Sequence, residues 1–166
     1  MKSKFSFLSI KTIPSLPWSS PKPLNFMPRI ITVGFLVLGL VLFGVGEAVL
    51  IAAGIGVSPW TVLAQGVTNL TGWSIGFSTF VVSGSVLLLW IPLRQIPGIG
   101  TVLNVIIVAA VIDFTLHYLP ITENDILQVL YAFAGVLVTG IGGGIYLAAN
   151  LGAGPRDGLM TGLQRF

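Results

Sequence analysis

The stretch from Gly39 to Val67 recurs later in the chain, and this duplication constrains the fold more than any other feature of the sequence. The second copy runs from Gly135 to Leu163, with Pro155 placed 96 positions after Pro59 (155 − 59). Each copy is typical of a long apolar helix, a glycine-rich break and a short polar helix opened by proline. A repeat at a fixed offset indicates two related halves. The positions of the first copy that are identical in the second are Gly39, Gly44, Gly46, Ala52, Ala53, Gly56, Pro59, Leu63 and Gly66.

The chain is too apolar for a water-soluble domain. Hydrophobic residues make up 54% of it and charged residues only 8%, whereas soluble domains carry about 25% charged residues. Four apolar runs are each close to the ~20 residues that cross a bilayer. We therefore expect an all-α integral membrane protein, a helical bundle of two inverted repeats with four full transmembrane helices and two short half-helices. The four runs cover residues 30–53, 74–92, 99–118 and 126–150.

The composition also argues against several classes of function. The chain has no cysteine, which excludes disulfides and thiolate metal sites. Its net charge of +3 does not indicate a nucleic-acid partner, because the charges flank the apolar runs. No G-x-S-x-G, H-E-x-x-H or phosphate-binding loop occurs. We expect the lipid bilayer as the partner, with no nucleic acid, no metal, no cofactor and no enzymatic activity.

Residues 1–28 form a basic segment. It contains Lys2, Lys4, Lys11 and Lys22, no acidic residue and several prolines, a composition typical of a disordered tail. The positive-inside tendency places this tail in the cytoplasm. A targeting segment and a translation start at Met27 are alternatives.

Small residues recur every four positions in the first apolar run and in its copy. This spacing puts them on one helix face, where backbones approach closely in lipid. We expect the two equivalent helices to pack through these faces, although glycine and alanine are also simply common in such spans. The residues are Gly44, Ala48 and Ala52 in the first copy and Gly140, Gly144 and Ala148 in the second.

Two acidic residues lie within apolar runs. Glu47 lies about four turns into the first run, and Asp113 about one turn from the end of the third. An acidic side chain at such depth is costly and marks a candidate solute-binding site. For Glu47 the alternatives are protonation, pairing with another helix, or contact with water near the interface. Its repeat counterpart is Gly143, so Glu47 is not part of the shared scaffold.

The first short helix is predicted at residues 59–70, after a break at Gly56. Pro59 suits the first helical position, with Ser58 as the N-cap. About 12 residues span only ~18 Å, so this helix re-enters the membrane or lies at its interface. Gln65 is its candidate solute-binding side chain.

The charges between the apolar runs predict the topology. If the short helix does not cross, Arg94 lies on the cytoplasmic side with the tail, and the acidic loop of Glu123 and Asp125 lies outside. Each half then contributes an odd number of spans, which inverts one half relative to the other. Inverted halves with short helices at symmetric places occur in secondary transporters.

The second short helix carries more charge than the first. Gly152 and Gly154 precede Pro155, which again suits a helix start, and Arg156 and Asp157 fall in the first turn. A positive side chain at a helix N-terminus predicts an anionic or carboxylate-bearing ligand. The alternative is structural, with Asp157 as a cap and an interfacial ion pair between Arg156 and Asp157.

Three motifs resemble the YczE/YyaS/YitT family of bacterial multi-pass membrane proteins. They are GxGxSPWxxLxQG in the first copy, PGIGTxLN with Gly100 and Asn104, and LGAGPRDGLM in the second copy. The resemblance implies an inner-membrane protein of about six spans in two repeats and little about activity. Family members usually carry an acidic residue where this chain has Thr61. We expect a first repeat at residues 29–118 and an incomplete second repeat at residues 126–166. The incomplete second repeat predicts either that the chain is a fragment or that a partner subunit supplies the missing spans.

The leading functional hypothesis is a transporter or permease-like protein for a small anionic or other organic solute. It rests on the inverted repeat, the paired short helices and the acidic side chains within the membrane. The alternative is a non-catalytic membrane assembly or accessory protein that acts through a partner. A homo-oligomer is compatible with both.

Overall fold

The computed structural model describes residues 16–119 and 121–164, and the regular secondary structure in these ranges is entirely helical. This confirms the predicted all-α class. The helices are α1 (Ile30–Ala53), α2 (Pro59–Thr71), α3 (Ile75–Leu89), α4 (Ile99–Tyr118), α5 (Asp125–Ala148) and α6 (Pro155–Leu163).

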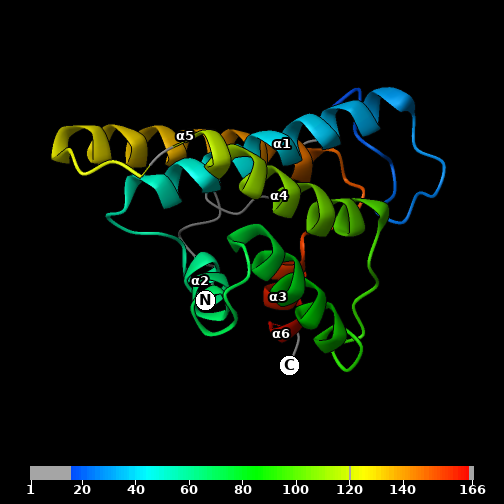
Figure 1. The fold of residues 1–166 in the computed structure, drawn as a ribbon. Helices are drawn as coiled ribbons and strands as arrows, with labels where there is room; N and C mark the ends of the chain where they lie inside the picture. The colour runs from blue at the N-terminus through cyan, green and yellow to red at the C-terminus, as the bar shows by residue number, and fades with distance from the viewer. Residues whose placement is uncertain (1–15, 120, 165–166) are drawn as a thin grey trace, which may run out of the picture.

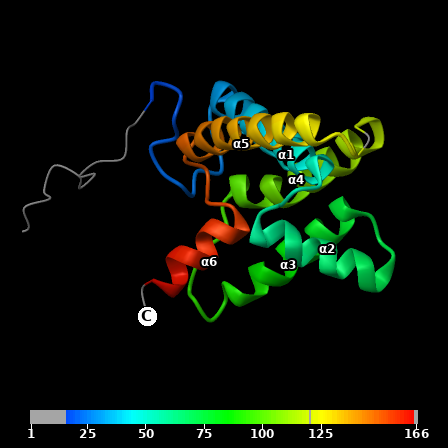
Figure 2. The same cartoon turned by 90° about the vertical axis from the view of Figure 1, so that its left-hand side faces the viewer.

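The helices form two layers. In Figure 1, α1, α4 and α5 lie side by side, with α2, α3 and α6 below them, and Figure 2 shows the same division from the side. α3 joins the layers because it packs on α4 as well as on α2 and α6. The layers bring the N-terminal turns of α2 and α6, which are far apart in sequence, to the underside of α1.

Three helices of the described chain, α1, α4 and α5, are long and apolar enough to cross a bilayer. The predicted span at 74–92 is shorter in the structure, because α3 ends at Leu89 and reaches only about 22 Å. Pro92 accounts for the early end, since proline lacks an N–H and disfavours helix at the preceding residue. α2 and α3 meet at a 114° bend and form a fourth crossing only if the bent pair is one broken span.

Both short helices begin where the sequence predicts. Ser58 is the N-cap of α2, and its side chain accepts a hydrogen bond from the Thr61 backbone N–H at 3.3 Å, with Pro59 in the first turn. α6 begins at Pro155, but its N-cap is Gly154, which offers no side-chain acceptor. α2 and α6 have 13 and 9 residues, too few to cross a bilayer alone.

The closest helix pair is α1 and α5, as predicted, but different glycines make the contact. Gly44 faces α4, where a methyl group would lie 2.9 Å from Val111 Cβ, and Gly140 and Gly144 have no neighbour within 4 Å. The contacting glycines are spaced by seven residues on each helix, a spacing that keeps one line of residues, the α1–α5 seam, facing the partner helix. The predicted four-residue spacing follows a different face of the helix. They are Gly39 and Gly46 of α1 and Gly135 and Gly142 of α5.

α1 and α5 run in opposite directions. The loop before α5 meets the end of α1, where the Thr122 N–H donates to the Ala52 carbonyl at 3.4 Å. The segment before α1 meets the end of α5, where the Ser20 N–H donates to the Ala149 carbonyl at 3.0 Å. The two ends of the bundle are thereby fixed by backbone hydrogen bonds.

Residues 16–28 differ from the expected disordered tail. The Trp18 ring stacks on Phe35 with a centroid distance of 4.3 Å, and the Trp18 carbonyl accepts from the Thr32 hydroxyl at 2.7 Å. The Asn150 side chain donates to the Ser20 carbonyl at 2.8 Å. Charge and proline content alone did not reveal these contacts. The first 15 residues of the predicted tail lie outside the described residues.

Candidate functional site

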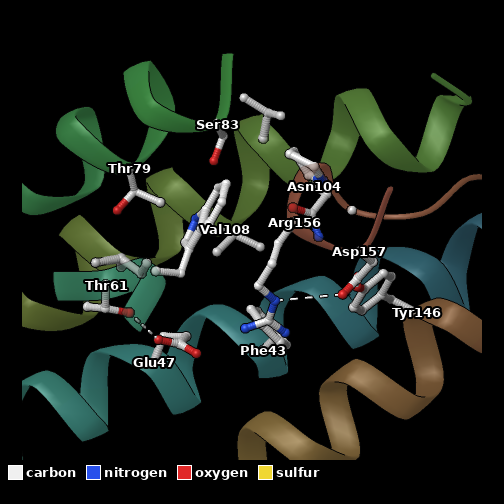
Figure 3. A pocket seen from close by; sticks show the side chains of 15 residues that line it. Phe43, Glu47, Thr61, Thr79, Ser83, Asn104, Val108, Tyr146, Arg156 and Asp157 are labelled. Carbon is white, nitrogen blue, oxygen red and sulfur yellow. Dashed lines mark hydrogen bonds and ion pairs between the residues drawn. The ribbon is translucent and has the colours of Figure 1, made fainter. Parts of the chain in front are cut away.

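A cavity lies between the two layers and takes residues from all six helices. About 530 Å³ of space that no protein atom fills lies within it, and this figure includes space that is open to the surroundings. Figure 3 shows Thr61 and Glu47 on one side, Asp157 and Tyr146 on the other, and the Arg156 side chain reaching between them. The remaining lining residues are Phe43, Trp60, Thr79, Ser83, Asn104, Val105, Val108, Ile112, Gly154 and Pro155.

Glu47 is the buried acidic group of this cavity. It projects from α1 with only 5% of its surface exposed. The Thr61 hydroxyl donates to Glu47 Oε2 at 2.7 Å, and Thr61 is positioned by the N-cap Ser58 at the start of α2. The helix start and the acidic side chain are therefore parts of one hydrogen-bonded unit.

The opposite side of the cavity is built by the start of α6. Tyr146 of α5 donates its hydroxyl hydrogen bond to Asp157. Arg156 Nε lies 3.6 Å from Asp157 Oδ1, and the guanidinium lies 5.8 Å from the centre of the Phe43 ring. The predicted ion pair between Arg156 and Asp157 is present, and it points into the cavity.

The loop before α6 is held by the start of α4. The Gly100 N–H donates to the Leu151 carbonyl at 2.8 Å, and the Thr101 hydroxyl donates to the Ala153 carbonyl at 2.7 Å. Gly152 has φ 115°, a backbone conformation that favours glycine, and a methyl group there would lie 2.8 Å from Thr101 Oγ1. This packing explains why Gly100 and Gly152 occur in the predicted motifs.

Asn104 comes from the same helix start and lines the cavity. A methyl group on Gly154 would lie 3.2 Å from Asn104 Nδ2, so the side chain is close to the α6 N-cap. The Trp90 indole N–H anchors α6 from the other side by donating to the Pro155 carbonyl at 3.1 Å. The first turn of α6 is thus fixed from both α3 and α4.

Two predicted solute-binding residues lie elsewhere. Asp113 accepts from the Gly76 N–H at 2.7 Å and from the Ser74 hydroxyl at 2.5 Å, so it caps the start of α3. Gln65 is half-buried on α2 and does not line the cavity. Gly56 lies in the break before α2, with no neighbour within 4 Å of a methyl group built on it.

Sequence reasoning missed Phe43 and Tyr146. The repeat holds a signal for Tyr146, because its counterpart 96 positions earlier is Leu50. An aromatic hydroxyl in place of an apolar residue marks a position where the two copies differ in chemistry. In residues 16–119 and 121–164, no group of three or more His, Cys, Asp or Glu side chains is placed to hold a metal ion.

The fold and the cavity define a polytopic helical membrane protein with a chamber between its layers that contains polar and charged side chains. The DUF6198 model, described as a family of unknown function, matches residues 30–166, and the chain belongs to this family. The match to the membrane protein YczE that is given below confirms the predicted resemblance.

Two relatives extend this comparison. An uncharacterized protein of Haemophilus influenzae is 36% identical over 158 residues, covering 95% of this chain and 72% of that protein. The uncharacterized membrane protein YczE of Bacillus subtilis is 31% identical over 129 residues, which cover 76% of this chain but only 60% of that protein. No solved structure matches.

Proposed function

We propose that this chain belongs to a secondary transporter or permease-like protein, and not to an enzyme, and that a small organic solute binds in the cavity between α1 and the two short helices. One observation carries the proposal. Trp60 and Thr61 of the first copy, and Arg156 and Asp157 of the second, line the same cavity. These are equivalent positions of the repeat (60 + 96 and 61 + 96). Convergence of two short helices on one polar site is how many transporters build a solute site.

The α1–α5 interface supports an inverted arrangement of the two copies. A methyl group on Gly39 would lie 2.5 Å from the Tyr146 nitrogen, and one on Gly135 would lie 2.7 Å from Leu50 Cγ. Gly135 and Tyr146 are the repeat counterparts of Gly39 and Leu50 (39 + 96 and 50 + 96). Replacing each residue by its repeat counterpart therefore turns the contact of Gly39 with Tyr146 into the contact of Gly135 with Leu50. A two-fold axis between the copies relates contacts in this way. Since α1 and α5 are antiparallel, such an axis crosses the helices, as in inverted repeats.

Transport by the reconstituted protein tests the proposal directly. Proteoliposomes carrying an inside-acidic or inside-basic pH difference are loaded with a panel of radiolabelled organic anions, cations and zwitterions. We expect one class to move faster than in protein-free vesicles, and Glu47→Gln to reduce the movement while Glu123→Gln in the exposed loop does not. Equal rates for all solutes with and without protein would remove the support for transport.

The proposed orientation places the chain in the inner membrane with its N-terminus in the cytoplasm. Arg94 and Glu123 lie beyond opposite ends of α4 and its neighbours. Single cysteines at these positions, labelled from either side of sealed vesicles, should react from opposite sides. Labelling of both from one side would contradict the orientation.

A second candidate function is membrane assembly through a partner protein or a second copy. Such a partner would contact the exposed apolar surface of α5 in place of lipid, since Val136 is 61% exposed and Ile141 58% exposed. This candidate predicts a protein that co-purifies after mild detergent extraction, and full activity of the assembly when Glu47 is replaced by Gln.

A further inference from the structure

The charged side chains that face the cavity do not balance. Glu47 comes from α1, and Arg156 and Asp157 come from α6. The other helices contribute apolar side chains and a set of polar ones that carry no charge at pH 7. The polar ones are Thr61 of α2, Thr79 and Ser83 of α3, Asn104 of α4 and Tyr146 of α5.

Two of the three charges already have partners. Arg156 lies 3.6 Å from Asp157, and Asp157 also accepts a hydrogen bond from Tyr146. The described residues place no Lys, Arg or His nitrogen within 4.0 Å of the Glu47 carboxylate. Its hydrogen-bond donor is the neutral Thr61 hydroxyl. The charge left uncompensated in the cavity is therefore negative.

An uncompensated carboxylate in this setting is costly. Glu47 is 95% buried (100 − 5) inside a helix that crosses the apolar region, where an isolated charge is stabilised by neither water nor a partner. A cation bound beside it would supply that partner.

The aromatic side chains of the cavity suit the same type of ligand. Phe43 already holds the Arg156 guanidinium 5.8 Å from its ring centre, so this wall binds a cation within the protein itself. Trp60 lines the cavity from the start of α2, next to Thr61. Indole is the most favourable aromatic surface for a cation, and the Trp60 position adjoins the donor of Glu47.

We infer that the cavity selects a small organic cation, held by Glu47 with Trp60 beside it. This inference rests on the proposed function and names the charge of its solute. An anion would instead meet Arg156, which is already paired with Asp157, and would be repelled by Glu47. The same geometry therefore disfavours the anionic solute that the sequence suggested.

Equilibrium binding to the purified protein in a non-ionic detergent tests the inference. The probes are radiolabelled benzyltrimethylammonium and benzylsulfonate, which are similar in size and opposite in charge. We expect saturable binding of benzyltrimethylammonium and weaker binding of benzylsulfonate. Glu47→Gln should reduce the affinity for the cation by roughly 10- to 100-fold, as expected for the loss of a charge-assisted contact.

Three matched variants separate the roles of the charges. Glu47→Asp keeps the charge and should retain cation binding, and Glu123→Gln changes an exposed loop acid and should bind as the wild type does. Arg156→Gln removes the partner of Asp157 and should strengthen cation binding, because it leaves a second carboxylate without a positive partner. The wild-type comparison of the two probes needs no variant, so the test survives a folding defect in any of them.

The outcomes distinguish the inference from the proposed function. Preferential binding of benzylsulfonate, lost in Arg156→Gln, would overturn the cation inference and leave a solute site in place. Binding of neither probe would overturn the cation inference, and it would overturn the proposed function as well if the proteoliposomes moved no solute.

Discussion

The two copies of the repeat present the same helix face in two different environments. On α1, Leu40 and Ala48 are completely buried, and Leu40 belongs to the core cluster that includes Val108 and Ile112 of α4. On α5, the counterparts of Leu40 and Ala48 (40 + 96 and 48 + 96) are Val136, which is 61% exposed, and Gly144, which has no neighbour within 4 Å. Equivalent sequence thus gives equivalent helices, whereas burial depends on whether another helix covers the face.

The two short helices likewise occupy equivalent places in the repeat but differ in the hydrogen bonds that they make. Thr61 and Asp157 occupy equivalent positions in the first turns of α2 and α6. Thr61 donates to Glu47 of α1, whereas Asp157 accepts from Tyr146 of α5. The shared backbone positions both units at one cavity, and the presence of Arg156 beside Asp157 gives its two sides different charges.

The largest expected loss of stability is at the α1–α5 seam, to which both copies contribute glycines. Gly142→Ala places a methyl group against the Phe43 backbone nitrogen, with the Gly39 carbonyl oxygen at 2.7 Å. Backbone atoms cannot move aside as side chains can, so α1 and α5 must separate. We expect a loss of about 3 kcal/mol of unfolding free energy, measured by denaturant titration in detergent micelles.

Gly143→Ala is the matched control for this change. Its methyl group would lie 3.6 Å from the Phe43 ring, an ordinary contact distance. We expect stability close to that of the wild type. Equal losses in the two variants would show that the seam does not hold the copies together.

The next effect tests the difference in burial. Leu40→Ala leaves a void under α4, because Leu40 is 0% exposed, and we expect a loss of about 2 kcal/mol. Val136→Ala at the equivalent position of α5 should cost less than about 0.5 kcal/mol, because this side chain is 61% exposed. Thermal unfolding of both variants in the same detergent gives the comparison. A cost for Val136→Ala that matched Leu40→Ala would mean that α5 is covered in solution.

Local features of the fold could be predicted from the sequence, and long-range features only in part. Pro59 and Pro155 mark helix starts because proline acts through its own backbone. The pairing of α1 with α5 followed from the repeat, but the choice of Gly39 and Gly142 over Gly44 did not, since several faces of both helices carry small residues.

The candidate site shows the same limit. Glu47 and Arg156 stood out as charges near apolar helices, but nothing in their spacing indicated that they share a cavity. Asp113 stood out for the same reason and instead caps α3 through Ser74, 39 residues away in the chain. The cost of burying a charge identifies such residues, and only the packing of the layers separates a helix cap from a cavity group.

A smaller effect is expected where the side chains of α4 can adjust. Gly44→Ala brings a methyl group to 2.9 Å from Val111 Cβ and 3.3 Å from the Val108 carbonyl. We expect a loss of about 1–2 kcal/mol, because part of the overlap is with a side chain that can shift. Gly140→Ala, its repeat equivalent, has open space and should be neutral or slightly stabilising, because alanine favours helix over glycine. Chemical unfolding of the pair measures the difference, and a stabilised Gly44→Ala would contradict the close packing of α1 on α4.

The smallest effect separates the polar units of the two copies. Thr61→Val and Tyr146→Phe each remove one hydroxyl donor from a carboxylate, Glu47 in the first case and Asp157 in the second. Asp157 keeps Arg156 as a partner, and its side chain is 26% exposed, whereas Glu47 is only 5% exposed. We expect losses of unfolding free energy of about 1 kcal/mol for Thr61→Val and about 0.5 kcal/mol for Tyr146→Phe.

Benzyltrimethylammonium at a saturating concentration should narrow the difference between these two losses, because a cation beside Glu47 replaces the lost hydroxyl donor. If Tyr146→Phe were the costlier change, Asp157 and not Glu47 would be the less compensated acid of the cavity. A difference that persisted with the cation present would contradict binding of the cation beside Glu47.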